Sequence, residues 1–281
     1  MHASEGFEPG HGCETTGMPD SNSVWAIDLD GVIWLGEQPI PGSASAVAQI
    51  RATGDRVLFV TNNSFSPVRE VEQKLERQGI PAAGDVITSA MAAASLVSAG
   101  ERVMVLGGPG IFEALAARGV DALDAGNYES GEIPGVDVVM VGFHRSFNYE
   151  RLRVGATAIR RGARLVATND DATYPTAGGP IPGGGSILAA VVTGSGVEPI
   201  VTGKPCRPMA DIVIARAGGV PAWMIGDRPD TDGEFALALG CPFGLVLSGI
   251  STASDLASID PRPNRVTDDL ATMVGEVLAT R

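Results

Sequence analysis

Two aspartates, Asp28 and Asp30, lie at the end of the apolar run Val24–Leu29. In an extended strand, side chains two residues apart point to the same side, so both carboxylates reach the same space. Burying a carboxylate is costly, and two neighbouring carboxylates repel each other, which favours protonation of one of them or a bound cation. A hard divalent cation with oxygen ligands, magnesium first among them, would relieve this repulsion.

Three further polar clusters also follow short apolar runs. They are Thr61–Ser64 (TNNS), Gly203–Pro205 (GKP, containing Lys204) and Gly226–Asp232 (GDRPDTD). Each cluster alone could be a turn or a helix cap. Because chemistry in open α/β sheets gathers at the carboxyl ends of the strands, we expect the four clusters to converge. Asp227 and Asp232 would then add negative charge beside the first pair, and Lys204 would add a compact positive charge.

The elements that must position these clusters alternate along the chain. Short runs rich in Val, Ile and Leu predict buried parallel strands at 24–29, 57–60, 103–106, 136–141, 165–167, 222–225 and 245–247. Helical periodicity predicts helices at 43–52, 67–78, 111–117, 149–161, 187–192, 208–217, 235–239 and 268–280. Repeated strand–helix units predict an α/β fold built on parallel sheets.

Composition narrows the class of protein and the kind of partner. The chain has 281 residues, enough for one large or two modest domains, and its 44% hydrophobic residues are typical of a globular protein. A net charge of −13 disfavours a nucleic-acid partner. Three widely spaced cysteines, and the lack of an apolar segment long enough to span a membrane, predict a cytoplasmic protein. Residues 1–20 are polar and Gly-rich, and we expect a disordered tail there.

Together the four clusters resemble the motifs of the haloacid dehalogenase-like phosphatases. The matching positions are D-x-D-G at Asp28–Gly31, a strand-end Thr61, Lys204, and G-D-x-x-x-x-D at Gly226, Asp227 and Asp232. Thr61 follows Asp28 by 33 residues, whereas Lys204 follows Thr61 by 143. This long second interval leaves room for an inserted α/β cap and is typical of subfamily IIA. That branch contains nitrophenylphosphatase-like enzymes, nucleotide phosphatases, and phosphoglycolate or glycerol-3-phosphate phosphatases.

The resemblance implies a domain organisation. Residues 21–87 and 197–281 would form a Rossmann-like parallel-sheet core that carries the four motifs. Residues 88–196 would form the inserted α/β cap, which closes over the site and contacts the rest of the substrate. Enzymes of this branch often dimerise through the cap, so a homodimer of that kind is one expectation.

The resemblance also implies a magnesium-dependent phosphatase that acts through an aspartyl-phosphate. Asp28 would be the nucleophile, and Asp30 would protonate the leaving group and then activate water. Magnesium would bind to Asp28, Asp227 and the backbone carbonyl of Asp30. Asp232 would orient either Lys204 or a metal-bound water. The phosphoryl oxygens would be bound by a set of polar groups: Thr61, Asn62, Asn63 and Lys204.

In the cap, four residues at expected strand-to-helix turns are candidates for contacting the substrate: His144, Arg145, Asn169 and Asp171. A loop Asn or Asp is nevertheless more often a turn or capping residue. The branch usually has T-N-P-D where this chain has 168–171 (TNDD), and an Asp where this chain has His144. The Gly-rich segment 178–186 lacks the ending of a phosphate-binding loop, which favours a turn that leads into a helix.

Several alternatives remain open at this stage. Glycerol 3-phosphate and 2-phosphoglycolate are the leading substrates, followed by a nucleotide monophosphate or a broad range of esters such as p-nitrophenyl phosphate. A phosphomutase of the same superfamily would carry its lid between the first two motifs, where this chain has only 33 residues. A receiver domain also uses a phospho-accepting Asp, but it is far smaller. A non-catalytic binding module would not need Asp28, Asp30, Lys204 and Asp227 together.

Overall fold

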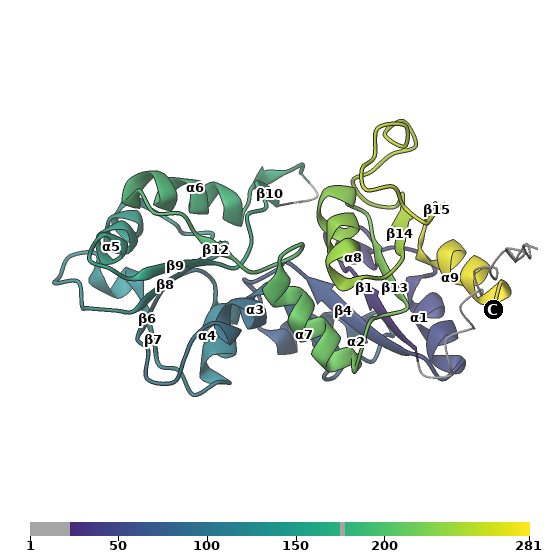
Figure 1. Ribbon diagram of the computed structural model, residues 1–281, viewed down its shortest axis with the longest axis horizontal. Helices are drawn as coiled ribbons and strands as arrows, with labels where there is room; N and C mark the ends of the chain where they lie inside the picture. The colour runs from purple at the N-terminus through teal and green to yellow at the C-terminus, as the bar shows by residue number, and fades with distance from the viewer. Residues whose placement is uncertain (1–22, 175–177) are drawn as a thin grey trace, which may run out of the picture.

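The computed structural model describes residues 23–174 and 178–281, and the chain forms two lobes, each built around a parallel sheet (Figure 1). The predicted disordered tail, residues 1–20, lies outside the described residues. The two parallel sheets and the helices around them confirm the predicted α/β class.

The larger lobe contains a six-stranded parallel sheet with the order β15-β14-β13-β1-β4-β5. Its strands are β1 (Val24–Ile27), β4 (Arg56–Thr61), β5 (Val86–Thr88), β13 (Trp223–Gly226), β14 (Phe243–Val246) and β15 (Arg265–Thr267). The strand β1 lies between β13 and β4. The segments that follow these three strands therefore meet at one edge of the sheet.

Helices cover both faces of this sheet, which explains why its central strands are mostly apolar. One face packs against α1 (Ser43–Ala52), α2 (Val68–Arg77) and α9 (Leu270–Ala279). The other face packs against α7 (Arg207–Ala217) and α8 (Glu234–Leu239). In β1, Trp25 and Ile27 face the first layer, whereas Val24 and Ala26 face the second.

The smaller lobe contains a five-stranded parallel sheet with the order β12-β9-β8-β6-β7. Its strands are β6 (Val103–Leu106), β7 (Ala122–Asp124), β8 (Val138–Val141), β9 (Arg164–Ala167) and β12 (Ile200–Val201). One face packs against α5 (Tyr149–Arg160), α6 (Gly184–Ser195) and the 3-10 helix η1 (Ala125–Tyr128), and the other against α4 (Pro109–Ala116). The helix α6 begins at Gly184, near the end of the Gly-rich segment, so this segment leads into a helix as the sequence predicted.

A short alanine-rich helix, α3 (Ser89–Ser95), lies where the two lobes meet. Its Ala92 packs into the core of the larger lobe, and Ala90, Ala93 and Ala94 pack into the core of the smaller lobe. Small side chains on both sides of the helix let both cores approach it closely. The helix begins directly after β5, near the predicted start of the cap at residue 88.

The segment that carries Lys204 enters the site from the smaller sheet. The apolar run before Lys204 forms β12, which pairs with β9 of that sheet. The smaller sheet therefore extends beyond residue 196, the predicted end of the cap. Two antiparallel hairpins complete the strands, β2 (Trp34–Leu35) with β3 (Gln38–Pro39) and β10 (Thr173–Tyr174) with β11 (Ile181–Pro182).

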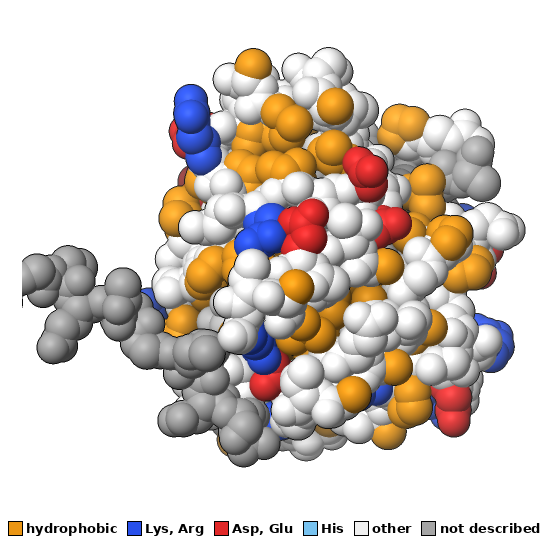
Figure 2. All heavy atoms as spheres, turned by 90° about the vertical axis from the view of Figure 1, so that its right-hand side faces the viewer, with side chains coloured by type: hydrophobic (Ala, Val, Ile, Leu, Met, Phe, Trp, Pro, Cys, Tyr) orange, Lys and Arg blue, Asp and Glu red, His pale blue; other side chains and the backbone are white. Residues whose placement is uncertain are grey.

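The end of the molecule on which α9 and the C-terminus lie carries charges of both signs close together (Figure 2). On this face, the net charge of −13 is thus not gathered into one patch. Among the described residues, every helix is too short or too polar to span a membrane.

Candidate active site

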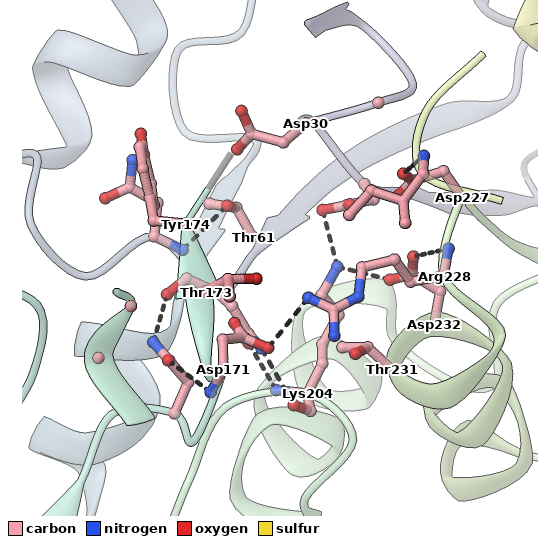
Figure 3. A pocket seen from close by; sticks show the side chains of 18 of the residues that line it. Asp30, Thr61, Asp171, Thr173, Tyr174, Lys204, Asp227, Arg228, Thr231 and Asp232 are labelled. Atoms are coloured by element: carbon pink, nitrogen blue, oxygen red, sulfur yellow. Dashed lines mark hydrogen bonds and ion pairs between the residues drawn. The ribbon is translucent and has the colours of Figure 1, made fainter. Parts of the chain in front are cut away.

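The predicted polar clusters converge on one pocket, here called the central pocket. From the predicted set, its lining includes Asp28, Asp30, Thr61, Asn62, Asn63, Asn169, Asp171, Lys204, Asp227 and Asp232. Figure 3 labels Asp30, Thr61, Asp171, Lys204, Asp227 and Asp232 among them, and shows these side chains entering from strand ends and loops of both lobes. The convergence follows from the sheet order, since β1, β4 and β13 are neighbours and β12 delivers Lys204 from the other sheet.

Lys204 forms the electrostatic centre of the pocket. Its Nζ lies 2.7 Å from Asp28 Oδ1 and 2.7 Å from Asp232 Oδ1, and its side chain is only 2% exposed. Burial alone would lower the pKa of Lys204, but the two carboxylates raise it above its ordinary value. The ammonium is therefore charged, and it holds two carboxylates that would otherwise repel each other.

The surroundings of the Asp227 carboxylate show whether a cation would fit this site. Carboxylate oxygens of Asp28, Asp227 and Asp232 lie within 4.8 Å of one another. Asp227 Oδ2 accepts a hydrogen bond from the Ile250 backbone N–H at 2.7 Å, whereas Oδ1 is buried without a hydrogen-bond partner. Burial and the nearby Asp232 raise the pKa of Asp227 to about 7. An unpartnered oxygen in a cluster of carboxylates fits a divalent cation.

Two glycines, Gly31 and Gly249, pack so closely against the Asp227 carboxylate that neither position has space for a side chain. A Cβ at Gly31 or Gly249 would collide with the Asp227 carboxylate, and Gly31 also has a positive φ of 83°. Glycine is therefore required where the D-x-D-G loop passes the second aspartate cluster. This requirement gives a structural reason for the fourth residue of the first motif.

Asp232 differs from the other two carboxylates because both of its oxygens already have partners. Oδ1 binds Lys204, and Oδ2 accepts a hydrogen bond from the Arg228 backbone N–H at 3.2 Å. Of the two roles left open by the sequence, this geometry favours orientation of Lys204. The open ligand atoms are then those of Asp28 and Asp227.

Asp30 lies on the opposite side of the central pocket from Lys204 (Figure 3). Its Oδ1 accepts a hydrogen bond from Trp34 Nε1 at 3.0 Å, and burial raises its pKa. Asp30 also lines a second cavity, here called the side pocket, which continues toward α2. The side pocket includes Trp34, Lys74, Arg77 and Arg145 and shares Asp30, Thr61, Asn63, Phe143 and Tyr174 with the central pocket.

Polar groups of the TNNS segment form hydrogen bonds within the protein, in addition to the predicted role of binding phosphoryl oxygens. Thr61 Oγ1 accepts a hydrogen bond from the Asn63 N–H, and Asn63 Oδ1 accepts from the N–H groups of Phe65 and Ser66 just before α2. The Asn62 carboxamide bonds to both backbone polar groups of Lys204 and to Asp171. Asn62 lines the pocket, but its side chain positions protein groups rather than facing an open space.

The four cap candidates fall in different places. Asn169 and Asp171 line the central pocket, and Arg145 lines the side pocket. His144 lies in the lining of neither, and its Nδ1 instead accepts a hydrogen bond from the Ser146 N–H at 3.1 Å. This turn holds His144 outside both pockets, away from the predicted contact with the substrate. Its neighbour Phe143 takes that place and lines both pockets.

Several lining residues were not among those predicted, and three of them bear on the chemistry of the site: Arg228, Phe143 and Tyr174. Phe143 stacks on Tyr174 with ring centroids 5.1 Å apart, and Arg228 Nη1 lies 3.3 Å from Asp171 Oδ1. Arg228 could have been suspected, because it is a cation inside the GDRPDTD segment. Phe143 lies in the loop after β8 and Tyr174 in the short strand β10, and a lone aromatic residue has no pattern that separates it from a core residue.

The fold and the site define a class of protein before any comparison is made. A buried Asp at the end of a central strand, a Lys between two carboxylates, a cation site and a second lobe over the pocket are the parts of a capped hydrolase that transfers phosphoryl groups to water.

Comparisons with known proteins agree with this class. A model of the haloacid dehalogenase-like hydrolases matches residues 25–121, and a HAD-hydrolase-like model matches residues 201–273. D-glycerol 3-phosphate phosphatase of Mycobacterium tuberculosis is 37% identical over 88% of this chain and 69% of that protein. Chloroplastic phosphoglycolate phosphatase 1A of Arabidopsis thaliana is 35% identical over 90% of this chain and 75% of that protein.

A solved structure is similar as well. The glycerol phosphate phosphatase of Mycobacterium tuberculosis in complex with magnesium superposes with a TM-score of 0.80 at 35% identity, covering 90% of this chain and 76% of that one. The chain belongs to the haloacid dehalogenase-like hydrolases. The predicted family and its phosphatase class are thereby confirmed.

Proposed function

We propose that this protein is a magnesium-dependent phosphatase that hydrolyses a small phosphate monoester through an aspartyl-phosphate. The observation that carries the proposal is the placement of Lys204 between Asp28 and Asp232, beside the unpartnered oxygen of Asp227. This arrangement offers one carboxylate as a nucleophile while keeping a cation and a metal site next to it. A simple binding site for an anion would not need three clustered carboxylates.

In the first step, an oxygen of Asp28 attacks phosphorus, and the bond from phosphorus to the leaving oxygen breaks. Asp30 gives its proton to that oxygen, so the alcohol leaves as a neutral molecule. Lys204 stabilises the charge on the phosphoryl oxygens, and it favours the ionised form of Asp28 against the burial that raises the pKa of that carboxyl. Thr61 and Asn63, which line both pockets, lie where they can contact the phosphoryl group.

In the second step, Asp30 accepts a proton from water, and the water oxygen attacks the phosphorus of the aspartyl-phosphate. The bond between phosphorus and Asp28 breaks, which releases phosphate and restores the carboxylate. Asp28, Asp227 and the backbone carbonyl of Asp30 would hold magnesium. When bound, the ion offsets the repulsion between the anionic ester and the carboxylates.

The side pocket indicates where the rest of the substrate lies. Because Asp30 protonates the leaving oxygen, the leaving group must extend from the side of the site on which Asp30 lies. There the side pocket continues between the cap aromatics and α2. We propose glycerol 3-phosphate or 2-phosphoglycolate as the substrate, supported by the names of the two relatives, with a nucleotide monophosphate or broad specificity as the alternative.

The proposal includes the division into a core and a cap. The core would comprise 21–87 and 197–281 and the cap 88–196, except that β12 (Ile200–Val201) pairs with β9 in the smaller sheet, so we extend the cap to Val201. A cytoplasmic location and a dimer formed through the cap remain predictions.

A screen of phosphorylated metabolites, ranked by kcat/KM with magnesium present, tests the function. We expect a small phosphate monoester to lead, p-nitrophenyl phosphate to be hydrolysed, and a chelator to remove activity until magnesium is restored. Full activity in excess chelator would contradict the metal site. Stable stoichiometric phosphorylation without turnover would favour a receiver, and binding without phosphorylation would favour a non-catalytic module.

A further inference from the structure

Asp171, a cap residue, belongs to a closed ring of polar contacts that passes through the catalytic groups. Asp171 Oδ2 accepts a hydrogen bond from Asn62 Nδ2 at 3.0 Å, and Asp171 Oδ1 lies 3.3 Å from Arg228 Nη1. Asn62 and Arg228 each lead on to Lys204, one through the Lys204 backbone and the other through Asp232. Figure 3 shows the dashed contacts that join Asp171, Arg228, Asp232 and Lys204.

The first arm of the ring fixes the backbone of Lys204. Asn62 Oδ1 accepts a hydrogen bond from the Lys204 N–H at 2.8 Å, and Asn62 Nδ2 donates to the Lys204 carbonyl at 3.1 Å. The same Nδ2 donates to Asp171, so both amide hydrogens and the amide oxygen have partners. The N–H and carbonyl of Lys204 set which way the Asn62 carboxamide faces, and the Asp171 contact is a third hydrogen bond that holds it in that position.

The second arm fixes the ammonium group of Lys204. Arg228 binds Asp171 through its side chain, while its backbone N–H donates to Asp232 Oδ2 at 3.2 Å. Asp232 Oδ1 in turn accepts from Lys204 Nζ at 2.7 Å. A displacement of Arg228 would therefore move the Asp232 carboxylate, which holds the Lys204 ammonium next to Asp28.

We propose that Asp171 is a positioning residue that couples the placement of the cap to the placement of Lys204, rather than a ligand of the substrate. The inference rests on the proposed function. Both carboxylate oxygens of Asp171 already have protein partners, and Arg228 compensates its charge. Asp171 reaches across from the smaller lobe, and Asn62 and Arg228 belong to segments that follow strands of the larger sheet. The ring therefore closes only while both lobes are together.

The chain offers a matched control in Asp170, which is an exposed carboxylate adjacent to Asp171 on the same loop. Asp171→Ala removes the contacts with both Asn62 and Arg228. Asp171→Asn keeps one oxygen acceptor for one of these donors, but its amide hydrogens face the other donor and cannot accept from it. For Asp171→Ala we expect kcat to fall about 10- to 100-fold with little change in KM. Asp171→Asn should fall between the wild type and Asp171→Ala, and Asp170→Asn should match the wild type.

The kinetic experiment uses three esters with different leaving groups: p-nitrophenyl phosphate, glycerol 3-phosphate and 2-phosphoglycolate. A positioning residue affects the phosphoryl transfer itself, so Asp171→Ala should lower kcat by a similar factor for every ester that the wild type hydrolyses. A loss that is confined to one ester, or that appears mainly in KM, would show that Asp171 contacts the leaving group and would overturn the proposal.

Amide hydrogen exchange of the metal-free protein supplies a readout that does not depend on turnover. The Lys204 N–H is held by Asn62, so its exchange should be faster in Asp171→Ala than in Asp170→Asn or the wild type. Unchanged exchange at Lys204 would overturn the coupling even if activity fell. If the wild type hydrolyses no ester, the proposed function fails by itself, while the exchange experiment still decides whether Asp171 holds Lys204 in place.

Discussion

The two parallel sheets use the same local design but contribute different chemistry to the pocket. Asp28, Thr61 and Asp227 follow strands of the six-stranded sheet, and each reaches the pocket from a strand end or the next residue. The five-stranded sheet contributes Phe143, Asp171 and Lys204 from the loops after β8, β9 and β12. In the proposed mechanism, the larger sheet thus supplies the reacting carboxylates, whereas the smaller one supplies aromatic surface, a positioning carboxylate and the cation.

This difference shows how the charges of the site are divided between the lobes. Asp28, Asp227 and Asp232 are buried carboxylates of the larger lobe, and their mutual repulsion opposes folding. Lys204, which follows a strand of the smaller sheet, offsets that repulsion from a position 2.7 Å from two of them. The electrostatic balance of the site therefore depends on the two lobes remaining in contact.

The largest effect is expected from removing the reactive group of the larger lobe. Asp28→Asn keeps the shape of the side chain but replaces the attacking carboxylate with a neutral amide. We expect kcat to fall by at least about 10⁴-fold, because the neutral amide cannot replace the carboxylate as the nucleophile that forms the acyl-phosphate. Steady-state hydrolysis of p-nitrophenyl phosphate measures the loss, and circular dichroism checks the fold. Substantial turnover by a folded Asp28→Asn variant would show that another residue is the nucleophile.

A smaller loss of activity, joined by a loss of stability, is expected from removing the cation. Lys204→Met keeps the length of the side chain but leaves Asp28 and Asp232 buried without a counter-charge. We expect kcat to fall about 10²- to 10³-fold and the free energy of unfolding to fall by about 3–5 kcal/mol. Urea unfolding measures the second quantity. Lys74→Met, at the half-buried lysine of α2, is the control. If both changes lowered the free energy of unfolding equally, the stability of the buried carboxylates would not depend on Lys204.

The fold was predictable where hydrophobic periodicity was strong. The sequence predicted a helix at 67–78, which is α2, and a strand at 103–106, which is β6. It missed α3, because the segment Ser89–Ser95 is almost entirely Ala and Ser and has no apolar face to detect. The run before Lys204 was recognised, but its pairing with β9 in the smaller sheet depends on long-range contacts that periodicity does not encode.

The site was predictable where charge and strand position coincided. Asp28, Lys204 and Asp227 are costly to bury, so their occurrence next to apolar strands was itself informative. Asn62 and Asp171 were instead expected to contact the substrate, because a sequence shows which polar groups are present and not which of them satisfy one another. The partners of Asn62 lie 109 and 142 residues away, beyond the reach of any local pattern.

The smallest effect is expected in the smaller lobe, where neighbouring cap residues give a matched pair. Phe143 lines both pockets and stacks on Tyr174, whereas His144 lines neither. Phe143→Leu loses the aromatic contacts, each worth about 0.5–1.5 kcal/mol, and should change kcat/KM roughly 3- to 10-fold by an amount that differs among esters. His144→Ala should leave kcat/KM within about twofold. Because the cap is proposed to contact the leaving group rather than phosphorus, Phe143→Leu should reorder the esters without abolishing any activity. An equal loss of kcat/KM on all esters, or a larger loss for His144→Ala than for Phe143→Leu, would contradict this division. In that division the larger lobe carries the reacting groups and the smaller lobe contacts the leaving group.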